Sequence, residues 1–216
     1  MKKILIALLA LALAGHGGNV LAVEEPSYEL IEKSGDVEIR EYRPLIVAET
    51  LVDGDMGSAG NRGFRLIAGY IFGDNQAPGA EGKQEKIAMT APVTMEPDSS
   101  GKMTTVEPLG IGGSMDARRW RVEFVMPSQY TTATLPRPRN TAVTIREVPS
   151  RRFAVLRFSG LVSEEKVQQK VGQLAEWMRQ RGLEAAGAPR LARYNPPWTL
   201  PFLRRNEVML EIRAID

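Results

Sequence analysis

The residue types that most often carry catalysis and metal binding are almost absent from this chain of 216 residues. It contains no cysteine, and its single histidine is His16. A serine triad of the usual kind needs histidine as its base, and zinc sites are usually built from histidine and cysteine. No glycine-rich phosphate loop precedes a predicted helix. The composition therefore argues against the common nucleophilic, zinc-dependent and nucleotide-dependent enzymes.

Two sets of charged residues remain as candidates for chemistry. Several glutamates fall on the polar faces of predicted strands, where solvated salt bridges are their ordinary role, and no spacing singles out a catalytic pair: Glu38, Glu41, Glu123 and Glu147. Three arginine pairs have the fork geometry that binds carboxylates or phosphates, and solvated strand ends are the alternative role. These pairs are Arg118-Arg119, Arg151-Arg152 and Arg204-Arg205.

The first 22 residues are typical of an export signal. A positively charged start at residues 1–3 is followed by an apolar run from Ile4 to Ala14, and Val20-Leu21-Ala22 resembles a cleavage site. The apolar run is shorter than the roughly 20 residues that span a bilayer, although a retained anchor is the alternative. We expect cleavage after Ala22, which would remove His16. The product would be a periplasmic or secreted protein without a stable membrane anchor.

The predicted mature chain, residues 23–216, is formally almost neutral. Loss of Lys2 and Lys3 lowers the number of basic residues from 28 to 26, which equals the 26 acidic residues. Nothing in this balance favours a nucleic-acid partner. The length is ample for one hydrophobic core, which must form without disulfides.

Short segments in which apolar and polar residues alternate predict half-buried strands. The predicted strands cover residues 28–33, 37–42, 46–51, 120–124, 143–147, 153–158 and 208–215. Ser34-Gly35-Asp36 has the turn chemistry of a hairpin between the first two. The segments 74–86 and 98–116 are rich in glycine and polar residues, and we interpret them as loops.

Two segments have helical periodicity. The second, 163–181, begins at a capping Ser163 and stops before Gly182. The first, 57–72, carries an apolar stripe, but it also contains four glycines that weaken a helix. Either this helix is frayed and faces a ligand, or its small residues allow close packing on the sheet.

A short internal sequence repeat suggests that the chain arose by duplication. Val37-Glu38-Ile39-Arg40-Glu41 returns as Val143-Thr144-Ile145-Arg146-Glu147, and each copy leads into a further strand and then a helix. We therefore predict one domain over residues 23–216 with two pseudo-repeats, at about 26–126 and 127–216.

Several motifs in order resemble the SOUL haem-binding protein family. They are Lys86-Ile87-Ala88-Met89-Thr90-Ala91-Pro92-Val93, Arg193-Tyr194-Asn195-Pro196-Pro197-Trp198 and Arg204-Arg205-Asn206-Glu207-Val208. The resemblance spans roughly residues 26–215. It implies an α+β fold in which duplicated β-α-β-β halves form a distorted antiparallel β-barrel with two packed helices. This fold also resembles the effector-binding domains of some transcription regulators.

The resemblance further implies that haem or a related porphyrin binds in an apolar surface groove beside the first helix. The candidate groove residues are Phe64, Ile67, Tyr70, Ile71, Met89, Val93, Tyr194 and Trp198, and core packing is the alternative role for each. Arg62 and Arg65 are the candidates for a basic rim, with Arg204 and Arg205 joining them if the last loop folds back. Basic residues proposed to bind propionates in animal members fall here on Asn61, Gly69 and Thr199.

Without histidine or cysteine, an iron ligand would have to be Met, Tyr or Lys, or else water. Met89, Tyr70 and Tyr194 are the candidates. Peroxidase or oxygenase chemistry is disfavoured, so we predict non-enzymatic carriage, buffering or scavenging of a tetrapyrrole in the cell envelope. Two alternatives remain: a small-molecule sensor or protein-interaction module that does not use haem, and a tetrapyrrole-modifying enzyme.

Overall fold

The computed structural model describes residues 23–79, 82–98, 115 and 117–213. The predicted export signal at residues 1–22 and most of the predicted loop 98–116 lie outside this part of the chain. Among the described residues, no helix has the length and apolar character needed to cross a membrane.

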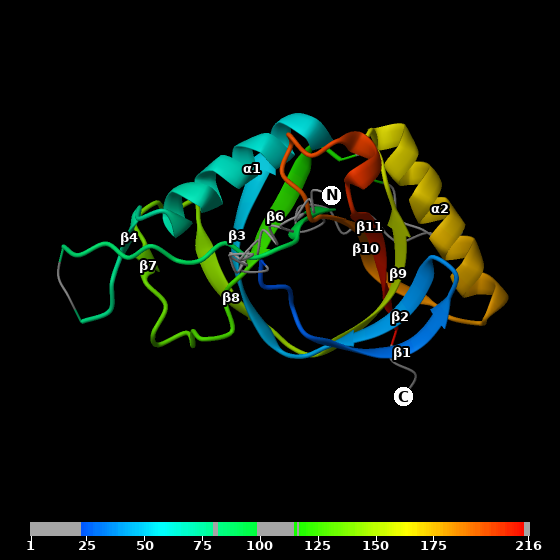
Figure 1. Ribbon diagram of the computed structural model, residues 1–216, viewed down its shortest axis with the longest axis horizontal. Coiled ribbons are helices and arrows are strands. Elements are labelled where there is room, and N and C mark those ends of the chain that lie inside the picture. Colours follow the sequence, from blue (N-terminus) through cyan, green and yellow to red (C-terminus); the bar gives the residue numbers. More distant parts are fainter. Residues whose placement is uncertain (1–22, 80–81, 99–114, 116, 214–216) are drawn as a thin grey trace, which may run out of the picture.

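Strands dominate the structure, and two long helices accompany them (Figure 1). In chain order the elements are β1 (Tyr28–Ser34), β2 (Val37–Tyr42), β3 (Leu45–Asp53), α1 (Met56–Ile71), β4 (Asn75–Gln76), β5 (Val93–Pro97), β6 (Arg119–Val125), β7 (Arg137–Pro138), β8 (Thr144–Val148), β9 (Arg151–Phe158), α2 (Glu164–Gln180), β10 (Ala185–Arg193), a short 3₁₀ helix (Pro201–Leu203) and β11 (Asn206–Ile212). The predicted strands and helices are all present, with ends shifted by a few residues. The predicted loop 74–86 contains β4, which pairs with β7, and β10 was not predicted.

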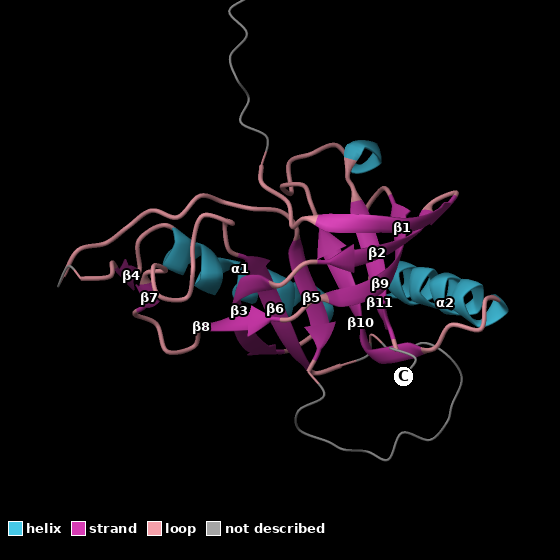
Figure 2. Cartoon of the chain, turned by 90° about the horizontal axis from the view of Figure 1, so that it is seen from below, coloured by secondary structure: helices cyan, strands magenta, loops and turns pink. Residues whose placement is uncertain are grey.

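Nine antiparallel strands form one curved sheet in the order β1-β2-β9-β11-β10-β5-β6-β3-β8 (Figures 1 and 2). The α+β class with two helices is confirmed. The predicted distorted β-barrel is wrong, because the end strands β1 and β8 do not pair and the sheet stays open. β1 is exposed along most of its length and carries a bulge between Leu30 and Glu32. A bulged edge strand is a poor template for a further ladder, which fits the unpaired edge at β1.

Apart from the additional edge strand β1, the order of strands is symmetrical about the central β10–β5 pair. On one side lie β11, β9 and β2, and on the other lie β6, β3 and β8. The two copies of the repeated segment form β2 and β8. Each pairs with a strand of the other predicted repeat: β2 with β9, where Tyr42 is opposite Arg151, and β8 with β3, where Val148 is opposite Leu45. This exchange joins both predicted repeats in one sheet, while the duplication itself stays a prediction.

Both helices pack on the same face of the sheet. α1 contacts β3 and β6, whereas α2 contacts β9, β10 and β11. The side chains of Asp55 and Ser163 cap the two helices by accepting hydrogen bonds from the backbone N–H groups of Ser58 and Lys166. A Cβ atom on Gly63 would lie 2.5 Å from Cγ2 of Val122. At this glycine, therefore, close packing is the explanation for the small residue.

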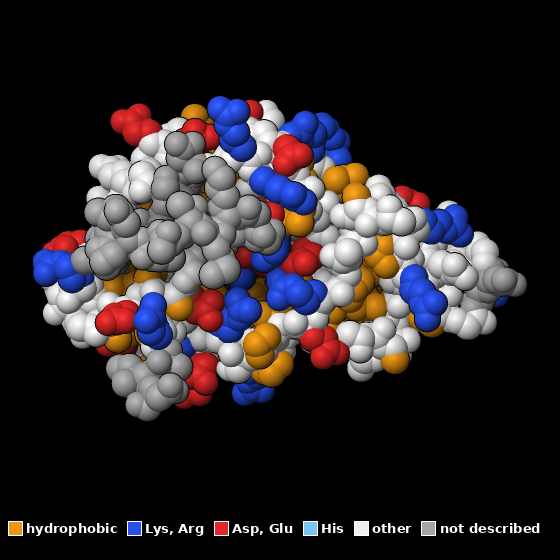
Figure 3. Space-filling model, turned by 180° about the vertical axis from the view of Figure 1, so that it is seen from behind, with side chains coloured by type: hydrophobic (Ala, Val, Ile, Leu, Met, Phe, Trp, Pro, Cys, Tyr) orange, Lys and Arg blue, Asp and Glu red, His pale blue; other side chains and the backbone are white. Residues whose placement is uncertain are grey.

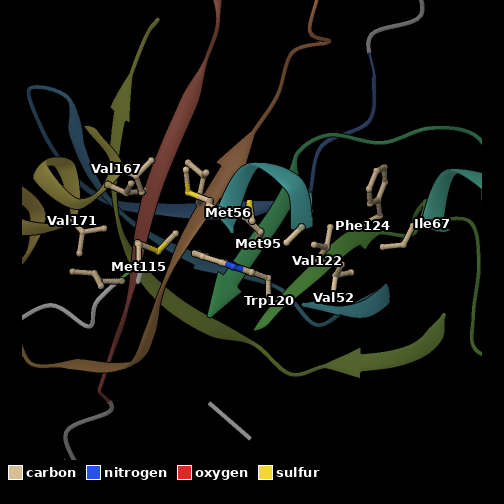
Figure 4. Close-up of a cluster of buried hydrophobic side chains, with 14 of the residues drawn as sticks. Val52, Met56, Ile67, Met95, Met115, Trp120, Val122, Phe124, Val167 and Val171 are labelled. Carbon is tan, nitrogen blue, oxygen red and sulfur yellow. The ribbon is translucent and has the colours of Figure 1, made fainter. Parts of the chain in front are cut away.

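The main core fills the space between the sheet and the helices. Its centre contains Met56, Met95, Met115, Trp120, Val122, Val167 and Val171 (Figure 4). The indole N–H of Trp120 lies near two backbone carbonyls, those of Gly54 at 3.0 Å and Ala117 at 3.1 Å. Each fully buried apolar side chain of this size stabilises the fold by roughly 1.5–3 kcal/mol, so the core holds both helices on one face.

Candidate ligand-binding site

A row of five paired residues crosses the sheet near one end of its central strands. The row runs Phe124, Val93, Arg193, Asn206 and Phe158, on β6, β5, β10, β11 and β9. Directly paired residues point to the same face of a sheet. The rings of Phe124 and Phe64 on α1 are 5.6 Å apart, so the row lies on the helix face. The other four residues of the row carry no charge, so Arg193 places a single cation among them.

Arg193 is unusual in its surroundings. The side chain is half-buried, and burial together with the positive charge of Arg204 lowers the pKa of its guanidinium. Among the residues that the structure describes, the side chain of Arg193 has no hydrogen-bond or ion-pair partner. Removing a cation from water without neutralising it is costly. The position is therefore suited to bind an anion.

Arg204 comes from the loop that joins β10 to β11, and it holds this loop in shape. Its Nε donates a hydrogen bond to the carbonyl of Thr199 at 2.8 Å, and its terminal nitrogen donates to that of Pro197. The backbone N–H of Arg205 donates to Oδ1 of Asn195 at 2.6 Å, which closes the base of the loop. The charge of Arg204 is thereby fixed near Arg193 and has no acidic partner within the described chain.

Large apolar side chains are exposed on α1, before β5 and on the loop that carries Arg204. Phe64 and Met89 are each more than one-third exposed. Trp198, Leu200, Phe202 and Leu203 on the β10–β11 loop are between 55% and 82% exposed. We call the surface formed by Phe64, Val93, Arg193, Arg204 and this loop the α1/loop surface. It combines two cations without acidic partners and exposed aromatic rings.

The structure places some of the predicted groove residues at the surface and others in the core. Phe64, Val93 and Trp198 belong to the α1/loop surface, and Met89 lies at the molecular surface four residues before Val93. Ile67, Tyr70 and Ile71 lie on the side of α1 that faces the sheet, and they are buried in the main core. The hydroxyl of Tyr70 donates a hydrogen bond to the carbonyl of Pro136 at 2.8 Å, and burial raises its pKa. These three residues do not reach the α1/loop surface in this conformation.

The remaining predicted residues lie apart from that surface. Arg62 lies against Gly54 in the turn before α1, about 200° around the helix from Phe64, and Arg65 is exposed on the helix. Tyr194 points to the sheet face opposite the helices. Its hydroxyl donates a hydrogen bond to Glu207 at 2.7 Å, and burial raises its pKa. Of the three candidate iron ligands, Met89 alone lies at the surface.

Sequence reasoning missed Arg193 and named Arg204 only on the condition that the last loop folds back. Arg193 is the first residue of one of the motifs that carry the family resemblance, which is the one signal that pointed to it. Arg205, also named on that condition, forms ion pairs instead with Glu207 at 3.0 Å and Glu25 at 2.9 Å.

The opposite face of the sheet holds networks of paired charges. Arg40 donates two hydrogen bonds to the buried carboxylate of Glu207, at 2.9 and 3.1 Å. Elsewhere on this face, Arg190 on β10 forms ion pairs with Glu96 on β5 at 2.7 Å and with Glu123 on β6 at 3.2 Å. Seen from behind, basic and acidic side chains are interspersed over the middle of the molecule (Figure 3). No group of acidic residues among those described could hold a metal ion.

A separate cleft of about 630 Å³ lies near the start of β3 and the ends of β6 and β8. Its walls include Glu24 to Ser27, Leu45, Val125, Tyr130 and Val148. This volume is within the range of small-molecule sites. The cleft shares none of its walls with the α1/loop surface.

Known proteins resemble this chain along almost the whole described length. A family model described as SOUL heme-binding protein matches residues 23–211. The chain belongs to this family. Heme-binding protein 2 of Homo sapiens is 32% identical over 197 residues, which cover 88% of this chain and 86% of that protein. Heme-binding protein 2 of Mus musculus is 31% identical over 174 residues, covering 77% and 75%.

Solved structures share the fold of this SOUL-family chain at low identity. The EcmrR C-terminal domain superposes with a TM-score of 0.55 at 12% identity, covering 87% of this chain and all but 1% of that one. A hydrolase from Listeria innocua superposes with a TM-score of 0.51 at 11% identity, covering 85% and 94%. Likeness at this level of identity shows the fold alone.

Proposed function

We propose that this protein binds haem or a related tetrapyrrole at the α1/loop surface and releases it unchanged. The observation that carries the proposal is Arg193, a half-buried cation without an acidic partner in the described chain, beside Arg204 and exposed aromatic rings. Haem is a large apolar plate with two carboxylates on one edge, so it matches this combination. Membership of the SOUL family and the names of the two mammalian relatives support the same ligand.

The residues present fit such a ligand in a specific way. Arg193 and Arg204 would hold the carboxylates, while Phe64, Trp198 and Phe202 would contact the plate. The positions Asn61, Gly69 and Thr199 are not basic here, so the charge would come from a strand and a loop instead. When bound, haem would supply its iron as a centre for ligand binding and electron transfer, and Met89 would be the candidate side chain to hold it.

The absence of histidine and cysteine from residues 23–216 supports binding without turnover. A haem enzyme of the peroxidase type relies on a nearby acid–base group, most often histidine. We therefore propose carriage, buffering or scavenging as the role. The export signal read from the sequence suggests that this occurs in the cell envelope. Cell fractionation, with a mass spectrum of the purified protein, would test whether the chain is exported and begins at Val23.

A haemin titration of residues 23–216 tests the proposal. We expect saturation at one equivalent for the wild type, and Kd raised about tenfold or more for Arg193→Gln, because a charge-assisted hydrogen bond is lost. Arg137→Gln, an exposed arginine on the distant two-stranded sheet, is the matched control. Iron-free protoporphyrin should bind with similar affinity if the plate and carboxylates dominate. Equal Kd values for Arg193→Gln and the control would contradict this site.

The 630 Å³ cleft favours a second candidate function, the binding of a different small molecule by a sensor or interaction module. The variant Ser128→Trp would place a large ring in this cleft. If haemin occupies the α1/loop surface, this variant should keep wild-type affinity. If Ser128→Trp loses haemin binding and Arg193→Gln keeps it, the haemin site would be the cleft and not the α1/loop surface.

A further inference from the structure

The β10–β11 loop exposes large apolar side chains, and the proposed haem site uses only part of them. Four large side chains project from it: Trp198, Leu200, Phe202 and Leu203. Leu161, in the connection between β9 and α2, is 61% exposed and lies beside the loop, since the N–H of Gly160 donates a hydrogen bond to the carbonyl of Pro201 at 2.9 Å. Exposed apolar clusters of this kind mark interaction sites.

Hydrogen bonds hold the loop in this projecting shape. The N–H groups of Thr199, Leu203 and Arg204 donate to backbone carbonyls within the loop. Asn206 donates from its side chain to the carbonyl of Gly160 at 3.1 Å. Figure 2 shows the loop and its short helix projecting beyond the end of the sheet. The apolar side chains are thus presented to the outside by an ordered scaffold.

The segment that carries the loop has charged residues of one sign only. From Ala185 to Asn206 the chain contains four arginines and no acidic residue. Two of these, Arg193 and Arg204, have no acidic partner among the described residues and lie at the base of the loop. Arg205 is neutralised by Glu25 and Glu207. A tip of Trp, Phe and Leu above unpaired arginines has the layout of a membrane-surface anchor, because rings enter the interface while guanidinium groups meet lipid phosphates.

We propose that the β10–β11 loop docks this protein reversibly on membranes that contain anionic phospholipids. Trp198, Phe202 and Leu203 enter the interfacial layer, and Arg193 and Arg204 face the headgroups. A single projecting loop favours a bilayer over a protein partner, because a standard protein interface needs about 800 Å² from each side. The proposal does not require haem. Where the proposed haem site also holds, haem and the bilayer compete for the same arginines and aromatic rings.

Vesicle flotation without haem tests the docking. The probes are vesicles of phosphatidylcholine alone and of phosphatidylcholine mixed with phosphatidylglycerol, at low and high salt. We expect binding to the mixed vesicles, weakening with salt, and a blue shift in the emission of Trp198, the most exposed of the three tryptophans. The double variant Phe202→Ser/Leu203→Ser should weaken partitioning about tenfold or more. Its matched control is Leu30→Ser/Ile31→Ser, two partly exposed residues on the edge strand β1.

Each other outcome overturns the proposal. Absence of wild-type binding to both kinds of vesicle would do so, as would equal loss of binding in both double variants. A concentration-dependent dimer that disappears in Phe202→Ser/Leu203→Ser, without vesicle binding, would identify a second copy of the chain as the occupant. Because no haem is present, failure here leaves the haemin titration unaffected, and failure of that titration leaves docking unaffected.

Discussion

Arg190 and Arg193 lie three residues apart on β10 and point to opposite faces of the sheet. Arg190 forms ion pairs with Glu96 and Glu123, and Arg193 has no partner in the described chain. The same contrast extends to their surroundings. The face of Arg190 also carries the Arg40–Glu207 pair, whereas the face of Arg193 offers aromatic rings and Arg204.

This contrast separates cations that serve the fold from cations that are available to a ligand. A buried arginine paired with carboxylates holds strands together, and removing either partner leaves an unpaired charge. A half-buried arginine without a partner costs stability, so we infer that it has a role outside the fold. Deviations from internal charge pairing are expected at functional sites.

The largest expected effect lies in the paired region. Glu207→Gln removes the buried carboxylate that Arg40, Arg205 and Tyr194 share, and leaves Arg40 with the carboxylate of Glu38 alone. We expect the free energy of unfolding to fall by about 3–5 kcal/mol. Urea unfolding measures this loss. The control is Glu211→Gln, whose ion pair with Arg151 is partly exposed and should contribute no more than about 1 kcal/mol. Similar losses in the two variants would show that burial does not distinguish these pairs.

The two arginines on β10 allow a direct comparison by the same substitution. Arg190→Gln should destabilise the protein by about 1–3 kcal/mol, because Glu96 and Glu123 lose a charged partner. Arg193→Gln should leave stability within about 0.5 kcal/mol or raise it. For haemin binding the order should reverse: Arg193→Gln should lower the affinity, and Arg190→Gln should leave it unchanged. Thermal unfolding and titration of both variants measure the two halves of this prediction.

A smaller loss of folding stability should appear as the pH falls. Burial alone would raise the pKa of Glu207, but the hydrogen bond and charge of Arg40 prevail and hold it below its usual value of 4.5. A carboxyl group with a lowered pKa in the folded state contributes stability above its unfolded pKa, and this contribution is lost as pH falls through the folded pKa. Stability should therefore decline below about pH 4.5, less steeply in Glu207→Gln. Parallel declines in the two proteins would assign the acid sensitivity to other carboxylates.

Local sequence signals predicted most of the elements around the site. Ser163 and Gly182 marked the ends of α2, and alternation marked β2, β6 and β9, because these signals depend on residues a few positions apart. β10 was missed because Gly187 and Pro189 interrupt it, and its ladder with β11 is irregular between Ala186 and Arg190. The open edge at β1 was also missed, since closure depends on a ladder between segments far apart in the chain.

The candidate site was predictable only in part, for a similar reason. Phe64 and Trp198 were named through the family resemblance and lie on the α1/loop surface. Ile67, Tyr70 and Ile71 share their helix with Phe64, but α1 turns them into the core. Helical periodicity defines which residues share a face, and it does not say which face meets the sheet.

The amino-acid sequence by itself determined the chemistry that is available. Residues 23–216 contain no histidine or cysteine, and the caps and alternating segments define the local elements. The tertiary structure alone decided which arginines are neutralised. Arg40 meets Glu207 across 167 positions of the chain, and Arg193 is opposite Val93 and Asn206, neither of which carries a charge. Pairing of charges depends on strand register and on the face of the sheet, and both are set by contacts between distant segments.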